Sequence, residues 1–361
     1  MKIDISISHP WLGEHAGSER VLLEFLKIFP DSDLYCLWKN QNKWDDFLEG
    51  NVVFSSYLNF FPGIKKYYKK IIPVLGSSAV ESLPKIRSKV HISNCHGFIK
   101  GIKVSEETYH YCYCYSPIRW ISDQEDMYRN SLDGFGKFFF DFLKPKIKNW
   151  ERKASKDVDE FLSISSFVSE RIKKTLNRSS KVIYPPVKTD FFTPGENTKK
   201  KNYLLVSRFV PYKRINTAVK AFAKSGKKIT MVGSGVIDYP NLEKYSNIKF
   251  LSGVTDSDLR DMYRTAKGLI FTSVEDFGLV PVEALSCGTP VVALGKGGAL
   301  ETVQDGVNGF FYEEDCPDLL NEAIDKLENS KISIDSCRER ALDFSTDRFI
   351  KNIKSTIKEN R

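Results

Sequence analysis

The sequence predicts an α/β protein with two doubly wound parallel sheets, and three observations predict it. Short apolar runs alternate with segments of helical periodicity through both halves of the chain. The 361 residues are enough for two domains that each bury a core. Three prolines at 183–195, followed by a polar, lysine-rich run at 196–202, interrupt this alternation, so we place the domain linker there.

These breaks define the expected domains. We expect a first domain at 1–190 and a second at 196–345, with a ligand cleft between them. A helix at 346–361 ends the chain, and for it we consider packing back on the first domain.

Composition and charge exclude several classes of protein. No window approaches the roughly 20 apolar residues that span a bilayer. Residues 1–8 alternate like a strand and lack the features of a signal peptide, which predicts a cytoplasmic location. The net charge of +8 comes without a nucleic-acid-binding motif, so we expect no nucleic-acid partner. Seven cysteines without a C-x-x-C pair predict reduced thiols and no metal site.

A glycine-containing turn follows the first strand. Gly13 and Gly17 permit a tight turn before the helical pattern at 21–26. The spacing is not G-x-G-x-x-G, which argues against a dinucleotide site.

The segment 57–75 interleaves basic with aromatic and aliphatic residues. This composition is typical of a helix that lies on a membrane interface. It is equally typical of an amphipathic helix that packs on the sheet and leaves its lysines in water.

Two further strands of the first half, 90–95 and 109–115, end in turns that carry His96 and Arg119. Strands of one parallel sheet end at the same edge, so both side chains should reach the same crevice. A purely structural role for His96 is the competing interpretation. Ser166 is the expected N-cap of the helix that follows the strand at 158–166.

The second half begins with a strand at 203–207, after which come Arg208 and Lys213. Two cations at a strand end and the next helical turn can hold one pyrophosphate from two sides. Solvated surface charges are the alternative. Later strands end in loops at Gly233 and Val254.

A strand–turn–helix–strand unit at 268–294 carries two carboxylates, Glu275 in the turn and Glu283 in the helix. The helix should begin near Gly278, with its N–H groups and positive dipole end directed into the crevice. The pattern favours a polyhydroxylated, anionic ligand, although a solvated loop residue and a helix-face charge would give the same spacing.

Several of these motifs resemble those of glycosyltransferase family 4. The residues Glu275-x7-Glu283 followed by Cys-Gly-Thr-Pro, and Arg208-x4-Lys213, resemble two of its signatures. Gly17-Ser18-Glu19 resembles its Gly-Gly-x-Glu loop, with Ser18 at the second glycine. Residues 90–120 resemble a subgroup of bacterial polysaccharide and O-antigen mannosyltransferases, with Tyr115 where that subgroup has a histidine.

The resemblance implies a GT-B fold, two Rossmann-like domains facing across a cleft, and a retaining, metal-independent transferase. It implies no cofactor beyond a nucleotide-diphosphate sugar, with GDP-mannose preferred over a UDP-sugar. The implied catalytic residues are Glu275, Arg208, Lys213 and His96. The implied donor site comprises Gly17, Arg208, Lys213, Gly233, Val254, Glu275, Phe277, Gly278, Leu279 and Glu283. The implied acceptor side comprises Gly13, Ser18, Arg119 and Tyr115.

The expected acceptor is a polyprenyl-linked, cell-surface glycan. An enzyme that uses it would lie on the inner face of the cytoplasmic membrane, in peripheral contact with anionic lipid. A sugar-nucleotide epimerase and a non-catalytic scaffold of the same fold are the alternatives.

Overall fold

The computed structural model describes residues 4–13, 17–48, 50–196, 200–237, 239 and 242–359. Internal contacts divide the chain into two units, residues 1–183 and residues 184–361. The division lies within the proline-containing stretch at 183–195.

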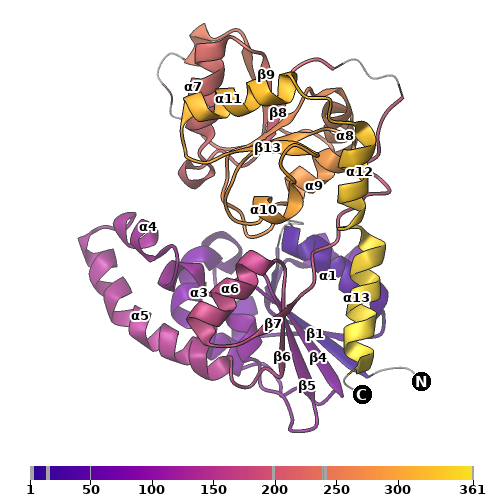
Figure 1. Ribbon diagram of the computed structural model, residues 1–361. Coiled ribbons are helices and arrows are strands. Elements are labelled where there is room, and N and C mark those ends of the chain that lie inside the picture. The colour runs from indigo at the N-terminus through magenta and orange to yellow at the C-terminus, as the bar shows by residue number, and fades with distance from the viewer. Residues whose placement is uncertain are drawn as a thin grey trace. The chain divides into compact units, whose positions relative to one another are not determined.

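The first unit contains a seven-stranded sheet in its described residues, in the order β3-β2-β1-β4-β5-β6-β7. All neighbouring strands pair in parallel, and the central ones are almost entirely buried. Helices flank the sheet (Figure 1). The strands are β1 (Ile5–Leu12), β2 (Asp33–Lys39), β3 (Val53–Ser55), β4 (Val90–Cys95), β5 (Tyr109–Cys114), β6 (Glu160–Ser163) and β7 (Ser180–Val182). The α-helices are α1 (Gly17–Ile28), α2 (Gln41–Trp44), α3 (Ile64–Glu81), α4 (Glu125–Asn130), α5 (Gly134–Ala154) and α6 (Ser166–Leu176).

Two local expectations for the first unit were wrong. The first strand extends through Pro10 to Leu12 instead of turning after Ser8. This is possible because β1 pairs with β4 only up to Ser8, so the missing N–H of Pro10 removes no bond on that side. Helix α6 is capped by Ser165, whose side chain accepts a bond from the Val168 N–H, and not by Ser166.

The second unit contains a six-stranded parallel sheet, in the order β10-β9-β8-β11-β12-β13. Its core packs apolar faces of α7 and α11 against the sheet. The strands are β8 (Tyr203–Val206), β9 (Ile229–Val232), β10 (Ile248–Leu251), β11 (Leu269–Phe271), β12 (Val291–Leu294) and β13 (Gly309–Tyr312). The α-helices are α7 (Ile215–Ser225), α8 (Asp256–Thr265), α9 (Leu279–Ser286), α10 (Ala299–Thr302), α11 (Pro317–Glu328), α12 (Ile334–Leu342) and α13 (Thr346–Glu359).

The strand orders confirm the predicted fold class of two doubly wound, parallel-sheet units. In each sheet the order reverses at one point, between β1 and β4 in the first unit and between β8 and β11 in the second. Loops diverge at such a switch point and leave a crevice at the carboxyl ends of the strands, where doubly wound sheets bind ligands. These two points are therefore the expected ligand-binding positions of the two sheets.

Candidate functional site

Lys213 and Glu275 meet at the switch point of the second unit. Lys213 ends a 3-10 turn (Pro211–Lys213) after β8, and Glu275 lies in the loop after β11. The Lys213 Nζ donates to Glu275 Oε1. The Thr272 hydroxyl donates to the Lys213 carbonyl at 2.7 Å and fixes the turn against the end of β11.

Arg208 follows β8 and lies exposed on the same edge of the sheet. Its Nη2 donates to the Tyr212 hydroxyl at 2.8 Å. The Tyr212 ring also lies 5.4 Å from the Lys213 Nζ, so it contacts both cations. An exposed guanidinium and a largely buried ammonium can together neutralise one diphosphate.

A glycine loop supports the segment that carries Glu275. The Gly298 N–H donates to the Glu275 carbonyl at 2.9 Å. A Cβ at Gly298 would lie 2.4 Å from the Phe277 Cα, and one at Gly297 would lie 2.6 Å from the Glu275 carbonyl. The loop after β12 must therefore be glycine here for the loop after β11 to keep its position.

Helix α9 begins at Leu279, as the sequence predicted. Gly278 precedes it at a φ of 92°, a conformation that favours glycine. Backbone N–H groups of a first helical turn have no intrahelical partner, so they can bind an anion or a hydroxyl. Phe277 is buried beside this turn.

Glu283 is buried within α9 and contacts a residue that the sequence analysis did not identify. The Tyr263 hydroxyl of α8 donates to Glu283 Oε2 at 2.9 Å. Burial raises the pKa of Tyr263, and the neighbouring Glu283 carboxylate raises it further, so the phenol stays protonated and remains a donor. Tyr263 thereby orients the Glu283 carboxylate.

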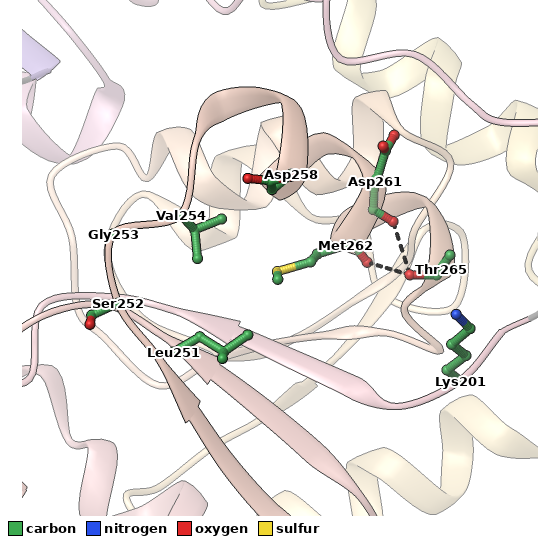
Figure 2. A pocket seen from close by; sticks show the side chains of 9 residues that line it. All are labelled: Lys201, Leu251, Ser252, Gly253, Val254, Asp258, Asp261, Met262 and Thr265. Atoms are coloured by element: carbon green, nitrogen blue, oxygen red, sulfur yellow. Dashed lines mark hydrogen bonds between the residues drawn. The ribbon is translucent and has the colours of Figure 1, made fainter.

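Gly233 and Val254 belong to the loops after β9 and β10. A Cβ at Gly233 would lie 1.8 Å from the Ser207 carbonyl, so only glycine fits at this crossing of two loops. Val254 lines an open pocket of about 480 Å³ along α8, together with Gly253 and Met262 (Figure 2). Asp258 and Asp261 lie on its helical side.

The first unit has a buried polar cluster at its own switch point. The Asn94 Nδ2 lies 3.1 Å from His9 Nδ1 and 3.3 Å from the Ser18 carbonyl. The Tyr115 hydroxyl donates to the same carbonyl at 3.2 Å. Ser18 in turn donates from its side chain to Glu19 Oε2 at 2.8 Å.

Three atoms of this cluster are buried without a hydrogen-bond partner among the described residues: His9 Nε2, Asn94 Oδ1 and His96 Nδ1. His9 Nε2 lies 3.8 Å from Glu19 Oε1, beyond hydrogen-bonding distance. Buried polar atoms are nearly always satisfied in folded proteins. These three atoms therefore have hydrogen-bonding capacity that the described residues leave unused.

His96 is electrically neutral in this setting. Burial and, to a smaller extent, the nearby His9 lower its pKa to about 3, although Glu19 acts to raise it. Its ring packs edge-on against Trp11, with ring centres 4.5 Å apart, and lies 6.0 Å from the Tyr115 ring. A neutral imidazole can exchange hydrogen bonds with a sugar hydroxyl but does not contribute positive charge.

Glu19 stays ionised beside it. Burial acts to raise the pKa of Glu19, but His9 and Ser18 lower it on balance. Gly17 starts α1 directly before these residues, and Gly13 ends the first strand, where its carbonyl accepts a bond of 3.0 Å from Trp44 Nε1. Glu14, His15 and Ala16 lie outside the described residues.

Arg119 begins a 3-10 turn (Arg119–Ile121) that follows β5. Its guanidinium is 3.4 Å from Asp123, which also pairs with Arg171 at 3.1 Å. β4 and β5 are parallel neighbours, so the prediction that both loops share one edge is confirmed.

A buried ion pair braces these two loops. Lys100 donates to Glu151 at 2.7 Å and to the Gly97 carbonyl at 2.7 Å. Glu151 also accepts the Ile118 N–H at 2.9 Å. The pair thus ties α5 to the turns that carry His96 and Arg119.

The described residues contain neither a metal-binding cluster nor a membrane-spanning helix. Within the described ranges, no three His, Cys, Asp or Glu side chains are grouped so that they could hold a metal ion. In that part of the chain no helix has the length and apolar character needed to cross a bilayer.

Comparison with known proteins gives this site a context. Residues 186–344 match the family model described as "Glycosyl transferases group 1". An uncharacterized glycosyltransferase of Methanocaldococcus jannaschii is 27% identical over 225 residues, which are 60% of this chain and 59% of that protein. An alpha-1,3/1,6-mannosyltransferase of Dictyostelium discoideum is 25% identical over 306 residues, 68% of this chain and 69% of the relative. The chain thus spans less than two thirds of the first of these relatives.

The fold also matches solved structures. HepE of Anabaena, solved in complex with UDP, superposes with a TM-score of 0.71 and 16% identity, and covers 98% of this chain and 100% of its own. This likeness extends over both units and shows that they have the GT-B fold.

Proposed function

We propose that this chain is a retaining glycosyltransferase that uses a nucleotide-diphosphate sugar. The contact between Lys213 and Glu275 at the β8/β11 switch point carries the proposal, with Arg208 on the same edge of the sheet. These residues lie within 186–344, the segment that matches the glycosyl transferases group 1 model.

The proposed chemistry follows from the charges at this edge. Negative charge develops on the leaving diphosphate as its bond to the sugar breaks, and fixed cations lower that barrier. Arg208 and Lys213 supply this positive charge, which removes the need for a metal or a cofactor. Glu275 and the N–H groups of Phe277, Gly278 and Leu279 hold the hydroxyls of the donor sugar. Glu283, oriented by Tyr263, accepts bonds from the ribose hydroxyls.

The proposed base and sugar are those of GDP-mannose, with a UDP-sugar as the competing donor. The resemblance of residues 90–120 to mannosyltransferases supports mannose, as does the activity in the name of the Dictyostelium relative. The proposed base site is the loop at Val254, beside the pocket of Figure 2.

Calorimetry with GDP, UDP and ADP tests the donor. We expect the wild-type chain to bind GDP more tightly than UDP and ADP, and the Lys213→Ala variant to lose most of this affinity. Tighter binding of UDP than GDP would reject GDP-mannose and keep the transferase, whereas no binding of any nucleotide would reject both.

The proposed acceptor side is the polar cluster of the first unit. His96 Nδ1 and Asn94 Oδ1 require partners, which hydroxyls of a sugar can supply. The acceptor side also includes Gly13, Ser18, Tyr115 and Arg119, with Tyr115 filling the position of the subgroup's histidine.

The proposed acceptor is a polyprenyl-linked glycan at the inner face of the cytoplasmic membrane. α3 buries Ile64 and Ile72 on one side, while Lys65, Lys66, Lys69 and Lys70 remain exposed on the other. Packing on the sheet and contact with lipid are therefore compatible. Each exposed lysine would contribute about 1 kcal/mol near an anionic leaflet, a contribution that salt screens.

Liposome co-sedimentation tests this contact. We expect the wild-type chain to bind anionic vesicles at low salt, and a variant with serine at positions 65, 66, 69 and 70 to bind less. Equal binding of the two proteins would assign α3 to packing alone.

A further inference from the structure

The first unit carries an apolar surface that its own core does not use. Four phenylalanines of α5, at positions 135, 138, 139 and 142, are exposed by 80%, 71%, 39% and 53%. Spacings of three and four residues place them on one side of the helix, and we call them the phenylalanine stripe. Helices of globular proteins normally turn such a stripe toward the core. A contiguous exposed apolar surface of this kind indicates an interaction site.

The other sides of α5 are occupied, so the stripe is not a packing surface for its neighbours. Phe140, Ile147 and Ala154 face the core. Ion pairs join α4 to α5: Arg129 binds Asp141 at 2.8 Å, and Glu125 binds two lysines of α5. α4 has no buried residue, and the two helices stand at the outer side of the unit in Figure 1.

Positive charge surrounds the stripe. α5 contains six basic residues and only two acidic ones, Asp141 and Glu151. Asp141 is paired with Arg129, Glu151 is buried against Lys100, and Glu125 pairs with Lys144 and Lys148. Among the described residues, the α5 cations outside these pairs are Lys137, Lys146, Arg152 and Lys153. The Lys146 Nζ lies 3.9 Å from the centre of the Phe142 ring, at the edge of the stripe.

We propose that the phenylalanine stripe inserts into the headgroup region of an anionic lipid bilayer. From Phe135 to Phe142 the stripe extends roughly 10 Å along the helix, which suits a helix lying in the plane of the interface. Lysine side chains reach the headgroups while their stems and the rings enter the acyl boundary. A second copy of the chain fits less well, because symmetric pairing would bring two basic α5 helices together.

The inference rests on the membrane part of the proposed function but relies on a different force. Attraction through the lysines of α3 is electrostatic, so salt weakens it. Insertion of phenylalanine removes apolar surface from water, so it persists in high salt. The two surfaces can therefore be tested apart in the full-length chain.

The test measures binding to vesicles of phosphatidylcholine with phosphatidylglycerol, at low and at high salt. Phe135→Ser/Phe138→Ser/Phe142→Ser removes the three most exposed rings of the stripe and leaves the buried residues of α5 intact. Gly134→Ala/Asn149→Ser on the same helix is the matched control. We expect the stripe variant to lose about a hundredfold or more of the salt-resistant partitioning. The control and the α3 lysine variant should keep that component.

Two additional readouts make the result decisive. The tryptophan emission of a Phe138→Trp variant should shift to shorter wavelength when vesicles are added, and this shift should exceed that of the wild type. Sedimentation velocity should show no change in association state between wild type and stripe variant.

The proposal is overturned if wild type shows no salt-resistant binding, if the stripe variant keeps it, or if the stripe variant only dissociates a dimer. Calorimetric binding of GDP and UDP is measured on the same proteins. If wild type binds nucleotide but shows no salt-resistant vesicle binding, the stripe proposal is rejected and the transferase proposal is kept. If wild type binds no nucleotide, the transferase proposal itself is rejected.

Discussion

At the scale of single residues, the proposed glycosyl transfer depends on the paired charges at the second switch point. We expect Arg208→Ala and Lys213→Ala each to slow glycosyl transfer by roughly a hundredfold or more, because each removes charge stabilisation of the leaving diphosphate. Steady-state rates with saturating acceptor measure the effect, and circular dichroism checks that the fold is retained. Lys181→Ala, on an exposed position of the first unit, is the control. Wild-type turnover in both the Arg208→Ala and the Lys213→Ala variant would remove these residues from the mechanism.

Buried histidines predict a loss of stability in acid. His110 is fully buried, with Nε2 2.9 Å from the Ser93 hydroxyl, and burial lowers its pKa to about 4. An unfolded chain, with a histidine pKa near 6.5, binds the proton first, so acid favours unfolding. His110 should thus cost roughly 3 kcal/mol of stability as the pH falls from about 6.5 to about 4.

Urea unfolding at several pH values measures this loss. His110→Gln should flatten the dependence relative to wild type, while stability at neutral pH changes less. An identical pH dependence in the two proteins would show that His110 binds its proton equally well in the folded state. His91 is buried against Ser6 and Ser8 and should add to the effect, since burial also lowers its pKa.

The sequence could identify residues that stand in one local pattern, but not those that come together from distant segments. Arg208 and Lys213 are five positions apart, and their spacing next to a strand pointed to the site. Tyr263 lies twenty positions before Glu283, and His9 lies far from Asn94, so only tertiary structure joins these pairs. For His9 and Asn94, the available sequence signal was their position at or next to the end of a predicted strand.

At the scale of elements, the loop after β12 should control the position of Glu275. Gly298→Ala would push a methyl group into the Phe277 backbone and displace the loop after β11. We expect donor affinity to fall by roughly tenfold or more, a cost of at least about 1.4 kcal/mol. Calorimetry with the tightest-binding nucleotide gives the number.

Gly134→Ala is the matched control, since a Cβ there meets nothing within 4 Å. If Gly298→Ala binds nucleotide as the wild type does, the two loops do not act as one unit.

The buried pair Lys100–Glu151 should stabilise the turns that carry His96 and Arg119. Lys100→Met leaves the Glu151 carboxylate buried and unpaired, which costs roughly 3–5 kcal/mol. Lys100→Met/Glu151→Leu removes both charges and should recover part of that loss. Urea unfolding of the two variants compares them, and equal stability of the single and double variants would contradict the coupling.

Elements with regular patterns were predictable, and elements that break those patterns were not. The strand–turn–helix–strand unit predicted at 268–294 is present as β11, α9 and β12. Helix α5 was not predicted as a whole, because an outward stripe of phenylalanines and an internal Pro145 obscure the usual amphipathic period. Helix α12 was not expected at all, since it is short and only Cys337 and Ala341 are buried.

At the scale of the whole molecule, the alternation of strands and helices was enough to predict two doubly wound units. Parallel sheets need crossover connections, so a repeated strand–helix pattern leaves few topologies. The strand order, and with it the two switch points, depends on which strands pair with each other, and the sequence alone does not show this pairing. Once that order is known, Arg208, Lys213 and Glu275 fall at the switch point of the second unit, whereas Gly233 and Val254 follow the neighbouring strands β9 and β10.

If this chain moves a sugar from a nucleotide-diphosphate donor to an acceptor, acceptor-dependent release of nucleoside diphosphate measures that transfer most directly. Wild-type protein, GDP-mannose and a lipid-linked glycan should release GDP and give a glycosylated product, and Lys213→Ala should release it roughly a hundredfold more slowly. Parallel reactions with UDP-sugars cover the competing donor. Conversion of the donor sugar without acceptor would indicate an epimerase, and absence of release with every donor and acceptor would indicate a scaffold. Either result would contradict the proposed glycosyl transfer.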